Sequence, residues 1–322
     1  MRHHFFITRR IPQEGIDFLA GHGRVSINPY DRALSPDELV ALGGECDGWL
    51  TMLTDLISPA VLEKCPNLRG ISNYAVGFNN IDIKECTSRR IGVSNTPDVL
   101  TDATAELAWA LILACARRVV EADAHVRRGE WKGWEPLQFQ GQAVTGKTLG
   151  IVGAGRIGAR VAEMSRGFDM RVIYSGRRTN KPLEESVGAQ RHELDDLLKQ
   201  ADVISLHLPL VPETRHLLSA PRFAIMKPTA IVINTGRGSL IDEADLLAAL
   251  REKRIAAAGL DVFEHEPKIT TGLNELANVV ILPHIGSATV ETRCRMAIMA
   301  AENLLAMTQG KLPAHPVNPE IY

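Results

Sequence analysis

Apolar positions recur with two different periods along the first hundred residues. Short apolar runs such as HHFFIT, DGWLTM and LRGISNY are separated by stretches with helical spacing, among them PQEGIDFLAG and SPDELVALGG. Strands and helices that follow one another in this way predict a parallel sheet covered by helices. Ser35 and Ser58 each precede a proline, a pattern that predicts a helix start with serine as the N-cap.

A second series of apolar runs follows in the later part of the chain. Its members are KTLGIVGAG, MRVIYSG, ADVISLHLPL, TAIVINTG, IAAAGLDVF and VVILPHI, and runs this apolar predict buried central strands. Between the two series, residues 98–128 keep helical spacing, which predicts one long helix that bridges two domains and packs on both. Residues 288–310 predict a last helix.

Composition and charge narrow the class of protein. A chain of 322 residues with 45% hydrophobic and 23% charged residues is typical of a soluble globular protein of about two domains. Its net charge of −2, without a basic run, predicts neither nucleic acid nor a membrane surface as partner. The longest apolar stretch, LAWALILACA, is too short to span a bilayer, and we expect a cytoplasmic protein. The five cysteines have no CxxC spacing, so neither a disulfide framework nor a metal site is predicted.

The segment GIVGAGRIG carries the spacing GxGxxG between an apolar run and a helical run. Gly153 would permit a tight turn, Gly155 would let the backbone approach a pyrophosphate, and Gly158 would let helix and strand pack closely. With Arg156 and Ile157 inside it, the segment predicts a dinucleotide-binding loop.

The next predicted strand ends in a basic turn. An NAD-binding protein usually carries Asp or Glu there for the ribose hydroxyls, whereas this chain has Ser175, Gly176, Arg177 and Arg178. Paired guanidinium groups suit a 2′-phosphate, which predicts NADPH as the preferred cofactor with NADH possible. The alternative is a solvated basic turn without a role in binding.

Three later segments, NTGRGSLIDE, GLDVFEHEP and LPHIGSAT, carry Arg237, Glu266 and His284. A cation, a carboxylate and an imidazole suit hydride transfer to a 2-keto acid. Arg can bind the substrate carboxylate and polarise its carbonyl, His can supply the proton, and Glu can keep that His charged. Glu264 competes with Glu266 for the place beside the histidine.

In this order and spacing, the glycine loop and the three segments resemble the D-isomer-specific 2-hydroxyacid dehydrogenase family, and its glyoxylate/hydroxypyruvate reductase branch in particular. The resemblance implies an α/β fold of two doubly wound parallel-sheet domains. A Rossmann cofactor domain at 100–287 would be inserted into a flavodoxin-like substrate domain at 1–99 and 288–322. The implied activity is NADPH-preferring reduction of glyoxylate or hydroxypyruvate to a D-2-hydroxy acid.

The resemblance also assigns further site residues. Its pattern DVFxxEP selects Glu266 as the partner of His284 and places Glu264 at the rim of the site. It implies that backbone amides of Val76 and Gly77 hold the substrate carboxylate, and that Leu53 and Leu100 line the pocket. Trp134 would reach the neighbouring subunit's active site, or else serve only as an aromatic anchor in the interface. The residues implied beside the cofactor, in addition to the glycine loop and the basic turn, are Thr104, His207, Thr235, Asp261, His284 and Gly286.

An apolar helix carrying Trp109 and the irregular segment WKGWEPLQFQG both call for a partner surface, which predicts a homodimer. Two enzyme alternatives are a 2-ketogluconate reductase and a D-3-phosphoglycerate dehydrogenase. A further alternative is a nucleotide-sensing scaffold that keeps the fold without turnover.

Overall fold

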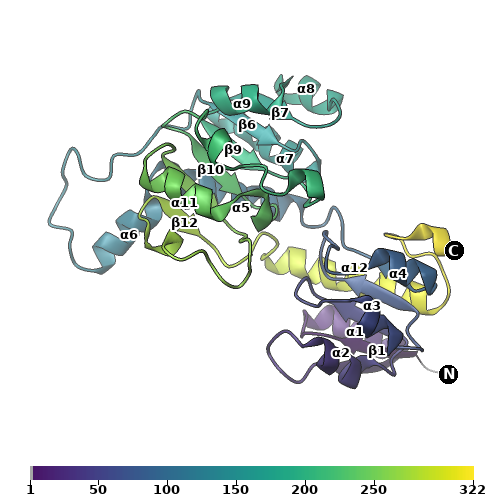
Figure 1. The fold of residues 1–322 in the computed structure, drawn as a ribbon. Coiled ribbons are helices and arrows are strands. Elements are labelled where there is room, and N and C mark those ends of the chain that lie inside the picture. The colour runs from purple at the N-terminus through teal and green to yellow at the C-terminus, as the bar shows by residue number, and fades with distance from the viewer. Residues whose placement is uncertain (1–2) are drawn as a thin grey trace. The chain divides into compact units, whose positions relative to one another are not determined.

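The computed structural model describes residues 3–322, which divide into two α/β units (Figure 1). Unit 1 contains the chain up to Leu100 together with Ser287–Tyr322, and unit 2 contains Thr101–Gly286. No helix among the residues described is long and apolar enough to cross a membrane.

Unit 1 is built on a five-stranded parallel sheet in the order β2-β1-β3-β4-β5. This is the flavodoxin-like order, as the resemblance implied. The five predicted strands are all present, as β1 (His3–Ile7), β2 (Gly23–Ile27), β3 (Gly48–Thr51), β4 (Gly70–Asn73) and β5 (Gly92–Ser94).

Side chains that alternate along the strands give unit 1 two apolar layers. On β1, Phe5 and Ile7 pack against the layer with α1 and α12, whereas Phe6 packs against the opposite layer. The helices are α1 (Gln13–His22) and α12 (Val290–Thr308) on one face, and α2 (Pro36–Gly43), α3 (Pro59–Glu63) and α4 (Ile83–Ser88) on the other.

The two predicted serine caps differ in what they do. Ser35 caps α2 with a capping box, because its hydroxyl accepts from the Glu38 amide while the Glu38 carboxylate accepts from the Ser35 amide. Ser58 occupies the N-cap of α3, but its side chain makes no capping hydrogen bond.

Unit 2 is built on a seven-stranded parallel sheet in the order β12-β11-β10-β9-β6-β7-β8. Counted from β6, this is the Rossmann order 3-2-1-4-5-6 with one more strand at the edge. The strands are β6 (Thr148–Val152), β7 (Arg171–Ser175), β8 (Gln190–Arg191), β9 (Val203–Leu206), β10 (Ile231–Asn234), β11 (Ala257–Leu260) and β12 (Val279–Ile281). The pattern did not predict β8, because two exposed residues are too short to show a period.

Helices cover both faces of the unit 2 sheet. One face carries α5 (Thr101–Ala116), α7 (Arg156–Met164) and α8 (Lys181–Val187), and the other carries α9 (Leu194–Gln200), α10 (Ala220–Phe223) and α11 (Glu243–Arg251). Short 3₁₀ helices lie at Ser165–Phe168, Pro212–Thr214, Gly238–Leu240, Leu273–Glu275 and Pro319–Ile321.

The prediction of one long helix over residues 98–128 was wrong. The helix ends at Ala116, and a second helix, α6 (Val119–Arg127), begins after Arg118. Arg118 has a φ of +53°, in the left-handed region, which no continuous right-handed helix contains. Both α5 and α6 belong to unit 2.

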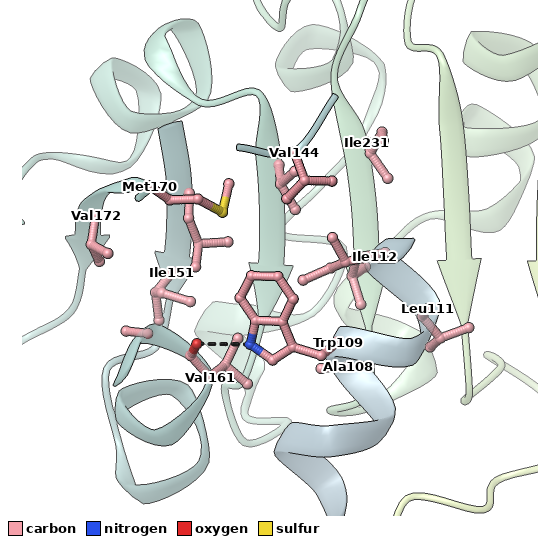
Figure 2. Packing of buried hydrophobic residues seen from close by; sticks show 14 of the residues in the cluster. Ala108, Trp109, Leu111, Ile112, Val144, Ile151, Val161, Met170, Val172 and Ile231 are labelled. Atoms are coloured by element: carbon pink, nitrogen blue, oxygen red, sulfur yellow. Dashed lines mark hydrogen bonds between the residues drawn. The ribbon is translucent and has the colours of Figure 1, made fainter. Parts of the chain in front are cut away.

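Trp109 is buried within unit 2 and needs no partner chain to cover it, contrary to the expectation. It is 6% exposed, and its ring stacks on Phe168 with 4.8 Å between the ring centroids. Its Nε1 donates to the carbonyl oxygen of Val161 at 3.0 Å, as the dashed line in Figure 2 shows. The apolar character of α5 comes from packing inside unit 2, against β10, β11, β12 and α7.

Candidate active site

The glycine loop joins β6 to α7, and its three glycines have different structural roles. Gly153 has a φ of +99°, and a Cβ there would lie 2.9 Å from the carbonyl carbon of His207. A Cβ on Gly158 would collide with the carbonyl oxygen of Gly153, so only glycine allows the helix to start this close to the strand. A Cβ on Gly155, in contrast, meets no heavy atom within 4 Å.

The start of α7 suits a phosphate. Gly155 is its N-cap and supplies no side chain to the first amides of a nine-residue helix. The helix begins at the carboxyl end of β6, where the strand order reverses between β6 and β9. Parallel sheets bind nucleotides at such switch points, and helix N-termini bind anions. The donors present therefore fit the pyrophosphate of a dinucleotide.

The turn after Ser175 is strongly basic. Arg177 and Arg178 are exposed, and neither guanidinium has an acidic partner in the part of the chain that the structure describes. Arg191, on β8, donates from Nε to the carbonyl oxygen of Gly176 at 3.1 Å. Three arginines thus lie at this turn, two within it and Arg191 in contact with its backbone. The sequence did not predict the third, because it lies on the unpredicted strand β8.

His284 and Glu266 form a hydrogen-bonded pair. The His284 Nδ1 lies 2.8 Å from Oε2 of Glu266, whose Oε1 accepts from the Phe263 amide at 3.0 Å. Burial alone would raise the pKa of Glu266, but the hydrogen bond and charge of His284, the Phe263 amide and the Arg237 charge together lower it below its ordinary value. The carboxylate is therefore ionised at neutral pH.

Glu264 does not lie at the rim, contrary to the expectation. Its side chain is only 11% exposed, and its Oε1 lies 2.9 Å from Arg215 Nη2 and 2.6 Å from His216 Nε2. The structure therefore pairs Glu266, and not Glu264, with His284. The partners of Glu264 come from a distant loop that no local pattern reveals.

The loop that carries His284 is fixed from beneath by two residues. Asp261, 1% exposed at the end of β11, accepts from the amides of Ile285 at 2.7 Å and Gly286 at 2.8 Å. Thr104 donates from its hydroxyl to the Gly286 carbonyl oxygen at 3.1 Å. Burial raises the pKa of Asp261 above its ordinary value despite these two bonds. His284 itself has a φ of +54°, in the left-handed region.

Arg237 follows β10 in a turn that packs directly on the Glu266 loop. Asn234 Nδ2 donates to the Arg237 carbonyl oxygen at 2.9 Å, and Arg237 Nη1 donates to the Gly236 carbonyl oxygen at 2.8 Å. A Cβ on Gly238 would collide with the backbone of Phe263, so this glycine lets the two segments touch. Burial lowers the pKa of Arg237, but a guanidinium stays charged at neutral pH.

A buried carboxylate that the sequence did not predict also holds the Glu266 loop in place. Glu243, 3% exposed at the start of α11, accepts from the Glu264 amide and from the Thr270 hydroxyl, each at 2.6 Å. Arg237, Glu266 and His284 thus follow three adjacent strands, β10, β11 and β12, at their carboxyl ends.

His207 and Thr235 follow β9 and β10. The His207 Nε2 lies 2.8 Å from the Ser205 hydroxyl, and burial lowers the pKa of His207 to about 3, so the ring is neutral. The Thr235 hydroxyl oxygen is buried and has no hydrogen-bond partner among the residues described.

In unit 1 the expected substrate residues also follow strand ends. Val76 and Gly77 come after β4, Leu53 comes after β3, and all three are half-buried, as is Leu100 at the end of the first segment of unit 1. In unit 2, Trp134 lies in a segment without helix or strand and is 84% exposed.

A doubly wound sheet with a glycine-rich βα turn, followed by a cation and a carboxylate–imidazole pair at its carboxyl edge, defines a nicotinamide-dependent dehydrogenase. Residues 109–286 match the family model described as D-isomer specific 2-hydroxyacid dehydrogenase, NAD binding domain. The chain belongs to the D-isomer-specific 2-hydroxyacid dehydrogenase family, whose members are NAD(P)-dependent enzymes.

Relatives resemble the chain over its whole length. It is 48% identical to a glyoxylate reductase of Thermococcus litoralis, covering 100% of this chain and 98% of the relative. It resembles the structure of the TT0316 protein of Thermus thermophilus with a TM-score of 0.92 at 42% identity, covering 98% of this chain and 99% of the other. An NADPH-dependent glyoxylate/hydroxypyruvate reductase of Sinorhizobium meliloti, solved with NADP and malonate, has a TM-score of 0.89 at 30% identity, covering 100% and 98%.

Proposed function

We propose that the protein is an NADPH-preferring reductase of small 2-keto acids, glyoxylate and hydroxypyruvate, which yields D-2-hydroxy acids. The observation that carries this proposal is the Glu266–His284 pair beside the Arg237 turn at the carboxyl ends of three adjacent strands. The glyoxylate reductase of Thermococcus litoralis and the NADPH-dependent reductase of Sinorhizobium meliloti support the choice of substrate.

The two ring nitrogens of His284 have different roles. When bound, the reduced nicotinamide supplies the hydride. Nδ1 of His284 donates to Glu266, which leaves Nε2 to donate its proton to the oxygen that was the substrate carbonyl. Once that proton has gone, the neutral ring keeps its hydrogen on Nδ1, so Glu266 fixes the tautomer as well as the orientation.

Arg237 acts on the other end of the substrate. Its planar group can bind the carboxylate at two points and polarise the neighbouring carbonyl. Because Arg237 is largely removed from water, which lowers its pKa, its charge is less screened than that of a surface arginine. We assign Arg237 to substrate binding and charge stabilisation, and His284 to proton transfer.

NADPH preference follows from the basic turn with Arg177 and Arg178. Charge-assisted hydrogen bonds contribute about 1.5–3 kcal/mol each, enough for a tenfold or larger preference. Replacing both arginines with Ala should lower kcat/KM for NADPH by about tenfold or more and leave NADH almost unchanged. Arg254→Ala, which removes an exposed arginine paired with Glu252, is the matched control. Equal losses with both cofactors would favour the solvated basic turn.

Substrate choice is tested by following cofactor oxidation with a panel of 2-keto acids and both cofactors. Turnover with glyoxylate or hydroxypyruvate supports the proposal. Faster turnover of 2-ketogluconate or 3-phosphohydroxypyruvate would favour the 2-ketogluconate reductase or the D-3-phosphoglycerate dehydrogenase. Tight NADPH binding without turnover of any of these acids would favour the nucleotide-sensing scaffold.

We also propose that a second copy of the chain covers one apolar surface of unit 2. Trp131 is 57% exposed, Trp134 84% and Leu137 77%, and these residues belong to one segment. On α6, just before this segment, Val119, Val120 and Val126 are each more than half exposed. Burying such apolar area in a two-fold homodimer is the common solution.

Light scattering at micromolar concentration tests the dimer, and Trp134→Ala tests the contact. A rise in KM for hydroxypyruvate in an intact dimer would indicate that Trp134 reaches the partner's substrate. An unchanged KM would indicate the anchor role alone. We further propose a cytoplasmic location, which the five free cysteines support because cytosolic thiols stay reduced.

A further inference from the structure

Three consecutive carbonyl groups after β4 are each tied by a donor from inside unit 1. The Ala75 carbonyl accepts from the Thr96 amide at 2.8 Å, and the Val76 carbonyl from Asn95 Nδ2 at 2.7 Å. The Gly77 carbonyl accepts from Asn73 Nδ2, also at 2.8 Å. No other loop carbonyls at this edge of the sheet are held in such an unbroken series among the hydrogen bonds of the described residues.

A hydrogen bond to a backbone C=O group also orients the N–H group of the next residue, because the two belong to one peptide group. A trans peptide group is planar, so its N–H points opposite to its C=O. The three tied carbonyls therefore turn the N–H groups of Val76, Gly77 and Phe78 away from the donors. None of these three N–H groups donates to an acceptor within the residues that the structure describes.

Burial indicates which side the free amides face. Asn73 and Thr96 are fully buried, whereas Val76 and Gly77 are half-buried and Phe78 is 40% exposed. The carbonyl oxygens thus face the interior of unit 1, and the N–H groups face its open edge. Successive backbone N–H groups directed to one side form an anion-binding concavity.

The two asparagines are themselves held in place. Asn73 Oδ1 accepts from the Thr51 hydroxyl at 3.0 Å, and its Nδ2 donates a second bond to Asn80 Oδ1 at 3.1 Å. Asn80 Nδ2 in turn donates to the Met52 carbonyl at 3.0 Å, which fixes the turn with Leu53. The backbone carbonyl of Asn95 accepts from Asn303 of α12 at 3.3 Å.

We propose that Asn73 and Asn95 are positioning residues that hold the amides of Val76, Gly77 and Phe78 as one cradle for the substrate carboxylate. The inference rests on the proposed function, and it adds the Phe78 amide and the two asparagines to the site. Neither side chain touches the substrate. Each acts by fixing one peptide plane, Asn95 that of the Gly77 amide and Asn73 that of the Phe78 amide.

Neutral asparagine is suited to this task. A lysine or arginine in the same place would bind the carboxylate itself or pair with a nearby acid. An aspartate could not donate to a carbonyl at neutral pH and would repel an anionic substrate. The amide side chain supplies the donor without adding charge beside the cradle.

The test compares Asn95→Ala with Asn67→Ala, a matched control on the surface of the same unit, where Asn67 donates to Glu45. We expect Asn95→Ala to raise KM for glyoxylate and Kd for oxalate, an unreactive dicarboxylate measured by calorimetry, by about fivefold to tenfold. The value of kcat and the affinity for NADPH should stay within about twofold. Asn67→Ala should change none of these quantities.

Asn73→Ala removes a fully buried side chain and should have the larger effect on KM, with a lower melting temperature. If Asn95→Ala fails to fold, Asn95→Ser carries the same expectation, because its hydroxyl is too short to reach the Val76 carbonyl. Amide NMR separates the two positions. Oxalate should shift the Val76, Gly77 and Phe78 signals of the wild type, and Asn95→Ala should reduce the Gly77 shift most.

The outcomes separate this inference from the proposed function. A wild type that binds oxalate through these amides but reduces no keto acid would refute the function and keep the cradle. A wild type that reduces glyoxylate, with KM and oxalate affinity unchanged in Asn95→Ala, would overturn the cradle. A fall in kcat with KM unchanged, or a wild type in which oxalate shifts none of the three amide signals, would overturn it as well.

Discussion

Two of the loops at the carboxyl ends of the sheets, one in each unit, are held by opposite chemistry. After β4 in unit 1, neutral donors tie carbonyl groups, so that N–H groups remain for a ligand. After β12 in unit 2, the buried carboxylate of Asp261 ties N–H groups, so that a side chain, His284, remains for the reaction. A loop that offers its backbone N–H groups to a ligand needs its C=O groups hydrogen-bonded to the protein interior. A loop that offers a side chain can instead have its backbone N–H groups hydrogen-bonded to the interior.

The charge of the holding group also suits each task. A carboxylate beneath the unit 1 loop would repel an anionic substrate, and the two side chains that donate to that loop, those of Asn73 and Asn95, are neutral. Beneath the unit 2 loop, the carboxylates of Asp261 and Glu266 both lie close enough to His284 to interact with it electrostatically. We therefore expect variants around the His284 loop to alter proton transfer, and variants beneath the unit 1 loop to alter carboxylate affinity.

The largest expected effect is that of His284→Ala. General acid catalysis typically accelerates a reaction by about 10²–10⁴-fold, so kcat/KM for keto-acid reduction should fall by about that factor at every pH. Oxalate affinity should stay within about twofold, because the carboxylate cradle lies in the other unit. His192→Ala, elsewhere in unit 2, is the control. A variant that loses oxalate affinity as strongly as it loses activity would erase the proposed division between the units.

Glu266→Gln should have a smaller effect that depends on pH. The lowered pKa of Glu266 keeps the wild-type carboxylate ionised from weakly acidic to alkaline pH, where it stabilises protonated His284. The alkaline limb of the kcat/KM profile for reduction should therefore move to lower pH in the variant, with a greater loss at pH 8 than at pH 5.5. A limb that stays in place would show that this carboxylate does not keep the imidazole charged.

The same shift predicts how stability depends on pH. Because folding lowers the pKa of Glu266, its contribution to stability is present above the ordinary value of 4.5 and is lost as the pH falls through the lower folded value. The wild type should therefore exceed Glu266→Gln in melting temperature at pH 7, and the difference should shrink below about pH 4.

The sequence predicted most of the fold, because the spacing of apolar residues and the residues at helix starts are local features of the chain. Alternating runs identified every strand except β8, and the serine–proline pairs located the starts of α2 and α3. The break at Arg118 was missed, because its left-handed backbone lies inside an uninterrupted helical pattern. Trp109 was placed on the surface, because an apolar helix does not reveal whether its own sheet or another chain will cover it.

Site residues with a local motif could be predicted, whereas those that hold the site could not. The pairing of Glu266 with His284 agrees with the motif, but Asn73, Asn95 and Glu243 have ordinary neighbours in the sequence. Their importance lies in bonds to segments several to many residues away, which only the folded chain reveals. The predicted place of Glu264 at the rim was wrong, because its partners Arg215 and His216 come from a distant loop.

Asp261→Asn should cost less activity than Glu266→Gln does at pH 8, but more stability. One of the two backbone N–H groups would face an NH₂ group instead of an oxygen, and an unsatisfied buried donor costs about 1–3 kcal/mol. We expect a loss of that size in denaturant unfolding and a fall in kcat of roughly tenfold as the His284 loop loosens. Unchanged stability would mean that the two hydrogen bonds do not hold the loop.

The smallest expected effect is that of Thr104→Val, which keeps the shape of the side chain and removes its hydroxyl. The Gly286 carbonyl then loses one neutral hydrogen bond, worth about 0.5–1.5 kcal/mol, so kcat should fall by less than it does in Asp261→Asn. Because Val adds no charge, the alkaline limb of the pH profile should not move. A rise in KM for NADPH with kcat unchanged would instead assign Thr104 to the cofactor, as the resemblance implied. If Thr104→Val cost as much activity as Asp261→Asn, the carboxylate would have no advantage over a neutral group beneath this loop, and the contrast between the two units would rest on the cradle alone.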